Sequence, residues 1–186
     1  MSNDRIPPQN LEAEQSVLGA MMLSKDMIAL VGMKLKPHHF YSHAHEAIFK
    51  VILELYQGNQ PIDLITVSEA LKKGDSLDQV GGRAYLAEII DSVPTTSNAQ
   101  QYADIVVDQA MLRQVIETGS AIVSDGFDKT QHVDDVLERA QQKIMDLSRE
   151  RVNDDFVPIK DVLMPVMDSM HDVYGAEDRK STRLNS

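Results

Sequence analysis

The chain has 186 residues, 42% hydrophobic and 25% charged, enough for one medium-sized domain or two small ones with a hydrophobic core. It has no cysteine, which excludes disulfide scaffolds, thiolate metal sites and a cysteine nucleophile. The net charge of −11 disfavours sequence-independent DNA binding, which needs clustered Lys and Arg, and favours a protein or small-molecule partner. The sequence shows no secretory signal and no run approaching the roughly 20 apolar residues of a membrane span, so we expect a cytoplasmic protein.

Residues 1–95 carry the start and stop signals of several short amphipathic helices. A polar residue that can accept a hydrogen bond from the first helical turn precedes each of the first three apolar patterns. Glycine or proline follows where the later patterns stop. The signals in chain order are Asn10; Ser42 and Gly58; Asp63 and Gly74; then Gly81, Gly82 and Pro94. Because these helices are short, we expect them to pack as a small helical bundle.

Residues 96–150 show two longer amphipathic patterns. Ser97 followed by Gln100 has the form of a capping box, and an apolar period of three to four residues then continues to Gly126. A second long pattern begins near His132. Two long helices joined by a short loop form an antiparallel hairpin, and each apolar face needs a partner. The pattern therefore predicts self-association through the hairpin.

The last 36 residues divide into three segments. Residues 151–157 are polar and without an apolar period, which is typical of a linker, and residues 175–186 are expected to be an unstructured tail. Residues 158–174 form an amphipathic linker helix, kinked at Pro165, that we expect to dock on another domain or subunit. Its docking face consists of Ile159, Val162, Leu163, Val166 and Met170. The predicted fold class is all-α: a bundle, a long hairpin and a separate linker helix.

No catalytic, cofactor-binding or metal-binding residues are expected in this chain. Four histidines within residues 38–45 could be drawn as a metal site, but their place at a helix boundary favours a role in satisfying chain ends. The sequence contains neither a phosphate-binding glycine loop nor a nucleophile or zinc-protease motif. The pattern of residues 65–86 resembles a helix-turn-helix motif. Its second helix would present a single positive charge, Arg83, which is not enough to bind the DNA backbone.

Several short motifs follow one another in a distinctive order. They are RIPPQNLEAEQSVLGA at 5–20, Phe40 and Tyr41 with His45, Pro61 to Asp63, Val80 to Leu86, and Tyr102 to Arg113. In this order they resemble the opening of bacterial DnaB-type replicative DNA helicases, collinearly as far as about residue 147. The resemblance implies an N-terminal collar domain with its linker.

The resemblance also implies how such a collar works. It implies pairing into dimers, three of which form a ring, while the linker helix packs on the neighbouring subunit's motor. ATP and magnesium would belong to a RecA-like motor domain that this chain lacks, as would most of the contacts with DNA. Partners would be primase and possibly a helicase loader, at a replisome associated with the bacterial nucleoid.

By position, the resemblance points to four residues as primase contacts: Glu12, Tyr85, Ile116 and Ile122. Each also fits a structural role, as a first-turn charge, a bundle core residue or a residue of the hairpin seam. The implied function is an oligomerisation and primase-recruiting scaffold of an ATP-dependent helicase that unwinds DNA at the replication fork. The alternative is an autonomous adaptor or decoy collar that binds helicase partners without motor activity.

Overall fold

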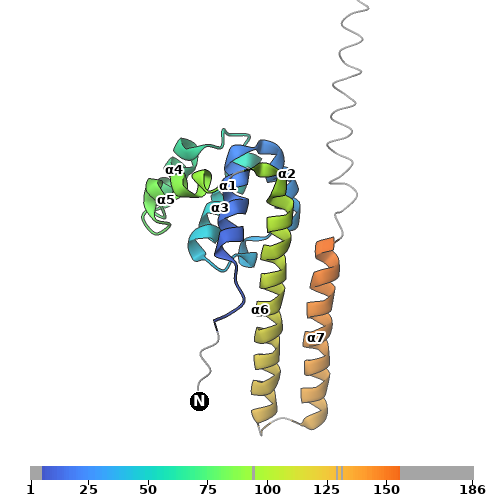
Figure 1. The fold of residues 1–186 in the computed structure, drawn as a ribbon. Helices are drawn as coiled ribbons and strands as arrows, with labels where there is room; N and C mark the ends of the chain where they lie inside the picture. Colours follow the sequence, from blue (N-terminus) through green and yellow to red (C-terminus); the bar gives the residue numbers. More distant parts are fainter. Residues whose placement is uncertain (1–5, 94, 129, 131, 156–186) are drawn as a thin grey trace, which may run out of the picture. The chain divides into compact units, whose positions relative to one another are not determined.

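The computed structural model describes residues 6–93, 95–128, 130 and 132–155 of the chain. In these residues all regular structure is helical, which confirms the all-α class. The elements are α1 (Leu11–Leu23), α2 (Lys25–Lys34), the 3₁₀ helix η1 (Pro37–His39), α3 (His43–Gln57), α4 (Leu64–Lys73), α5 (Gly82–Asp91), the 3₁₀ helix η2 (Thr96–Asn98), α6 (Ala99–Phe127) and α7 (Val133–Asp155) (Figure 1). The chain divides into two compact units, Met1–Ser148 and Arg149–Ser186, and the fold below is that of the first. Among the described residues, no helix is long and apolar enough to cross a membrane.

Three of the predicted helix starts are confirmed by hydrogen bonds. The Asn10 side chain accepts from the Ala13 backbone N–H at 2.9 Å, which satisfies one of the unpaired amides of the first turn of α1. Ser42 caps α3 in the same way, and Asp63 caps α4 by accepting from two backbone N–H groups. Local polar chemistry therefore sets where these helices begin.

Two boundaries differ from the sequence predictions, and one helix was not predicted. The unpredicted helix is α2, which is separate from α1 because the backbone of Ser24 is extended and interrupts the helix. The capping box at Ser97 is wrong: Ser97 lies in η2, where its backbone N–H donates to the Thr95 hydroxyl, and α6 begins at Ala99. Finally, α7 continues to Asp155, so residues 151–155 of the expected linker are helical.

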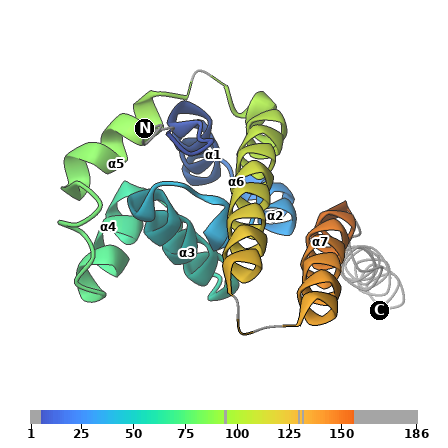
Figure 2. The ribbon, with the colours of Figure 1, turned by 90° about the horizontal axis from the view of Figure 1, so that it is seen from below.

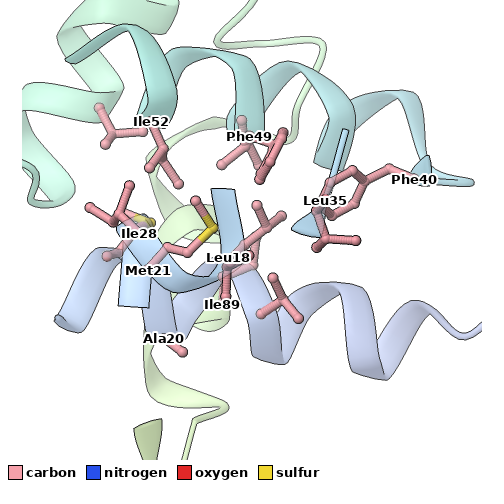
Figure 3. Packing of buried hydrophobic residues seen from close by; sticks show 14 of the residues in the cluster. Leu18, Ala20, Met21, Ile28, Leu35, Phe40, Phe49, Ile52 and Ile89 are labelled. Carbon is pink, nitrogen blue, oxygen red and sulfur yellow. The ribbon is translucent and has the colours of Figure 1, made fainter. Parts of the chain in front are cut away.

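The core forms around α1, which contacts α2, α3, α5 and α6. Figure 3 shows Leu18 and Met21 of α1 among Phe49 and Ile52 of α3 and Ile89 of α5, all fully buried. Burial of such side chains stabilises the fold by about 1.5–3 kcal/mol each. These contacts explain why five short helices, none of them stable alone, hold together.

Close packing of α1 on α5 depends on Gly19. A Cβ at this position would lie 2.5 Å from the carbonyl oxygen of Ile89 and would also overlap the Val93 side chain. Glycine therefore permits an approach of the two helices that any side chain would block.

The first part of α6 belongs to the bundle. Ala99, Ala103, Val106 and Ala110 recur at helical spacing and are buried against it, so the bundle extends past residue 95 to about residue 110. Only the second half of α6 projects beyond the bundle, and α7 returns antiparallel to it (Figure 1). Lys143 of α7 donates to Asp125 of α6 at 2.7 Å. The expected linker helix 158–174 and tail 175–186 lie outside the described residues.

Candidate functional site

A pair of titratable side chains is buried where α1, α3 and α5 meet. Glu14 lies on the same helical stripe as Leu18 and Met21, and His45 lies on the stripe of Ile48 and Ile52, so folding buries both. Each is only 1% exposed. A buried carboxylate is costly unless its oxygens are hydrogen-bonded, so its partners matter.

All partners of Glu14 are donors. Its Oε1 accepts from the Tyr41 backbone N–H at 2.7 Å, and its Oε2 accepts from the Ser42 backbone N–H at 3.3 Å. Nδ1 of His45 lies 2.6 Å from the same Oε2. We assign the imidazole proton to Nδ1, because the carboxylate can only accept.

The network continues from His45 to α5. With the proton on Nδ1, Nε2 accepts from the Tyr85 hydroxyl at 2.7 Å, and the Tyr85 oxygen accepts from the Gln15 side-chain amide at 2.9 Å. The Glu14–His45–Tyr85 network therefore joins three helices and the segment before α3. Nε2, the atom that would act as a general base, is already occupied by Tyr85, so the arrangement acts structurally.

The four residues that the resemblance points to lie in two places. Glu12 is exposed on the first turn of α1, one turn before Gln15. Gln15 donates a hydrogen bond to the half-buried Tyr85, so Glu12 and Tyr85 lie near one another on the bundle. Ile116 and Ile122 lie on the projecting half of α6, where Ile116 is 53% exposed and Ile122 is half-buried. Six residues turn a helix by about 240°, so Ile116 and Ile122 do not share one face.

Both helices of the hairpin expose an apolar stripe. Viewed down the helix axis, the exposed apolar residues of α6 fall within a sector of about 60° of the circumference, and those of α7 within about 40°. We call these the hairpin stripes; they comprise Leu112, Ile116, Val123 and Phe127 of α6 and Val133, Leu137 and Ile144 of α7. Exposure ranges from 49% at Leu112 to 80% at Phe127. Apolar side chains gathered in this way on a surface typically mark a site of protein association.

Arg113 joins α6 to the start of the chain. Its guanidinium donates to the Pro8 carbonyl at 2.8 Å and to the His39 carbonyl at 2.7 Å, and it lies over the Tyr41 ring. One planar cation thus holds the N-terminal segment, η1 and α6 together. The projecting half of α6 therefore starts from a fixed point.

The histidines of residues 38–45 have separate environments. His38 and His43 are exposed, whereas His39 and His45 are buried, and His39 accepts from the Lys36 backbone N–H through Nδ1. Among the described residues, no group of three or more His, Asp or Glu side chains could hold a metal ion. Arg83, the cation of the possible DNA-reading helix, is bonded to Glu69.

Two carboxyl groups on the bundle, of the half-buried Glu46 and the exposed Asp63, have lowered pKa values. The Lys50 ammonium donates to Glu46 at 2.6 Å and lowers the pKa of that carboxyl group. The Thr66 backbone N–H, which donates to Asp63, lowers the pKa of Asp63. Both shifts favour the charged form of the carboxyl group. In that form Glu46 pairs with Lys50 of the same helix, and Asp63 caps the start of α4.

Sequence reasoning missed the Glu14–His45 pair and the Arg113 clamp. The signal for the pair was present, since each residue falls on an otherwise apolar stripe and a buried charge needs a partner. Nothing local indicated Arg113, whose two acceptors lie more than 70 positions away in the chain.

Comparisons with known proteins agree with this fold. Residues 6–108 match the family model described as DnaB-like helicase N terminal domain. Replicative DNA helicase DnaC of Bacillus subtilis is 40% identical over 172 residues, which cover 92% of this chain and 38% of that protein. The chain therefore spans well under half the length of this relative.

Two solved structures are similar as well. The N-terminal domain of DnaB helicase from Mycobacterium tuberculosis is 44% identical, with a TM-score of 0.71 over 76% of this chain and 99% of that one. A DnaB-like replicative helicase, described with its interactions with primase, is 25% identical, with a TM-score of 0.61 over 87% of this chain and 35% of that one. On its fold and on these matches, the chain belongs to the family of DnaB-like helicase N-terminal domains.

Proposed function

We propose that the chain is the oligomerisation and primase-interaction region of an ATP-dependent replicative DNA helicase. The observation that carries the proposal is the pair of hairpin stripes, which leave large apolar side chains in contact with water. A surface of this kind is stable in solution when a partner covers it. The family supports this role, because a similar helicase is described with its interactions with primase.

Self-association is the first part of the proposal. A second copy offers the same stripes, so a two-fold arrangement would bury the apolar faces of both copies together. The resemblance to DnaB-type helicases suggests further assembly of three dimers into a ring. The part of α6 that carries the stripe projects beyond the bundle helices (Figure 1), so pairing would leave the bundle surface free for other partners.

Primase binding is the second part. Glu12 and Tyr85 mark the bundle end of the proposed contact, and Ile116 and Ile122 mark the hairpin. Glu12 is exposed and suited to direct contact, whereas Tyr85 is tied to His45 and contributes by holding α5 in place. A helicase loader is a further proposed partner of this region.

The remaining activities are proposed for the full-length protein. ATP and magnesium would bind a motor domain, which would also make most of the contacts with DNA, in the cytoplasm at the nucleoid-associated replisome. The linker stripe of residues 159–170, which lies outside the described residues, would dock on the motor of a neighbouring subunit.

The self-association is tested by light scattering on the chain after size-exclusion chromatography. Wild type should have at least the mass of a dimer, and Ile116→Asp should shift the equilibrium towards monomer. Ser124→Asp is the matched control, because Ser124 is exposed on α6 outside the stripe. A monomeric wild-type protein at micromolar concentration would contradict this part of the proposal.

Primase binding is tested by calorimetric titration with the C-terminal helicase-binding domain of the cognate primase. Saturable binding is expected, and it should weaken in Glu12→Ala and in Ile122→Asp. No binding by the folded wild-type chain, even in its associated form, would count against a primase-recruiting role.

A further inference from the structure

A groove between α3 and α4 takes part in none of the functions above. The two helices lie side by side in both views (Figure 1 and Figure 2), and the groove between them, which is open to solvent, has a volume of about 960 Å³. Val51 and Leu55 of α3 and Ala70 of α4 form its apolar part. Neither Tyr85 nor any residue of the hairpin stripes lines this groove.

The charge at the rim of the groove differs from that of the whole chain. Lys72 and Lys73 line it at the end of α4, and neither forms an ion pair with a described residue. Glu69, the acidic residue nearest to them on α4, is already paired with Arg83. Glu54 lies across the groove on α3 and is the remaining carboxylate of the lining. In a chain of net charge −11, two adjacent lysines without carboxylate partners are a local exception.

An exposed apolar residue lies on the same helix as these lysines, outside the lining of the groove. Ile65 is 66% exposed and lies one turn before Glu69 and two turns before Lys72, so the three share one side of α4. Ile65 is too exposed to stabilise the bundle core, because side chains stabilise a fold in proportion to the apolar area they bury. The groove and the side of α4 next to it therefore combine apolar surface with two lysines that form no ion pair with a described residue.

We propose that this groove binds a short acidic and apolar peptide segment of a partner protein. Carboxylates of the segment would pair with Lys72 and Lys73, while an apolar side chain would cover Val51 and Ala70. Nucleic acid fits less well, because two lysines neutralise few phosphates. Peptides that combine both features gain specificity from charge and affinity from burial.

The proposal is tested by selecting binders from a phage-displayed library of random peptides on the immobilised wild-type chain. Two variants of equal net charge are compared afterwards: Lys72→Gln/Lys73→Gln, which removes the rim charges, and Lys50→Glu, which changes an exposed lysine of α3 that is paired with Glu46. Circular dichroism establishes that both variants are folded.

Enriched peptides should carry Asp or Glu beside Leu, Ile, Phe or Met. Their affinity should fall at least tenfold in the Lys72→Gln/Lys73→Gln variant, stay within twofold of wild type in Lys50→Glu, and weaken as salt is raised. Three results would each overturn the proposal: no enrichment, enrichment without acidic residues, or equal affinity for the two variants. Since the readout is peptide binding by the chain alone, it is independent of whether the chain self-associates or binds primase.

Discussion

Replacing Glu14 by leucine tests the buried network most directly. Leucine has a similar volume but no acceptor, so the Tyr41 backbone N–H and the His45 Nδ1–H would both lose their partner. Each buried donor left without an acceptor costs about 1–3 kcal/mol. We therefore expect Glu14→Leu to lower the free energy of unfolding by about 3–5 kcal/mol, against a typical total of about 5–15 kcal/mol.

The Glu14→Gln variant should lie between wild type and Glu14→Leu. Glutamine keeps one oxygen for the Tyr41 N–H, and His45 can change tautomer so that Nδ1 accepts from the new amide and Nε2–H donates to Tyr85. The Ser42 N–H, at 3.3 Å the longest bond of the set, loses its acceptor, and the Tyr85 O–H loses Nε2 as its acceptor. The expected loss is about 1–2 kcal/mol.

The assay is urea unfolding followed by far-ultraviolet circular dichroism at one protein concentration, because self-association would change apparent stability. Glu12→Leu is the matched control, since Glu12 is exposed on the same turn of α1, and its effect should stay within about 0.5 kcal/mol. The reasoning is refuted if Glu14→Leu is no less stable than Glu12→Leu.

Three further predictions concern other parts of the bundle. Gly19→Ala should lower the free energy of unfolding by about 1–3 kcal/mol in thermal unfolding, because its Cβ would meet the Ile89 carbonyl. Gly119→Ala is the control: Gly119 lies in open space within α6, so this change should be neutral or stabilising. A Gly19→Ala variant as stable as wild type would contradict the close packing. Arg113→Lys should lower the free energy of unfolding by about 1–2 kcal/mol in urea, because a lysine cannot donate to both the Pro8 and the His39 carbonyl in one plane. An unchanged urea midpoint would show that these two hydrogen bonds are not needed for stability. The pKa of Asp63 is held below its ordinary 3.8, so its stabilising effect is fully present above that value and is lost as pH falls through the lower folded pKa. The melting temperature of wild type should consequently drop more on acidification than that of Asp63→Asn, and parallel pH profiles would exclude this cause.

Helix starts could be predicted because their causes are local. Asn10, Ser42 and Asp63 each accept a hydrogen bond from a backbone N–H no more than three residues away, so a few neighbouring residues determine the N-cap of the helix. Ser97 had the same local signature, yet the η2 turn formed by the preceding residues displaced the helix start to Ala99. A capping pattern thus predicts a boundary only where no competing turn satisfies the same amides.

The buried network could not be derived because its partners are distant in sequence. Glu14 and His45 are 31 positions apart, and His45 and Tyr85 are 40 apart. Helical periodicity assigns each residue to a buried face but does not say which faces meet. The same holds for the division of α6, whose apolar period continues unchanged from the buried Ala110 to the exposed Val123. Burial there depends on where the other helices end.

The continuity of α6 makes it a mechanical lever. Its first part is clamped in the core and by Arg113, while the 111–127 stretch extends about 25 Å beyond at a rise of about 1.5 Å per residue. A tilt of about 5° at the clamped end would move the tip by about 2 Å, since a helix transmits rotation with little bending over this length. A partner that displaces the hairpin on binding would therefore also displace the part of α6 that packs on α1. In the other direction, a small rearrangement inside the bundle would be enlarged at the hairpin surface where two copies would meet.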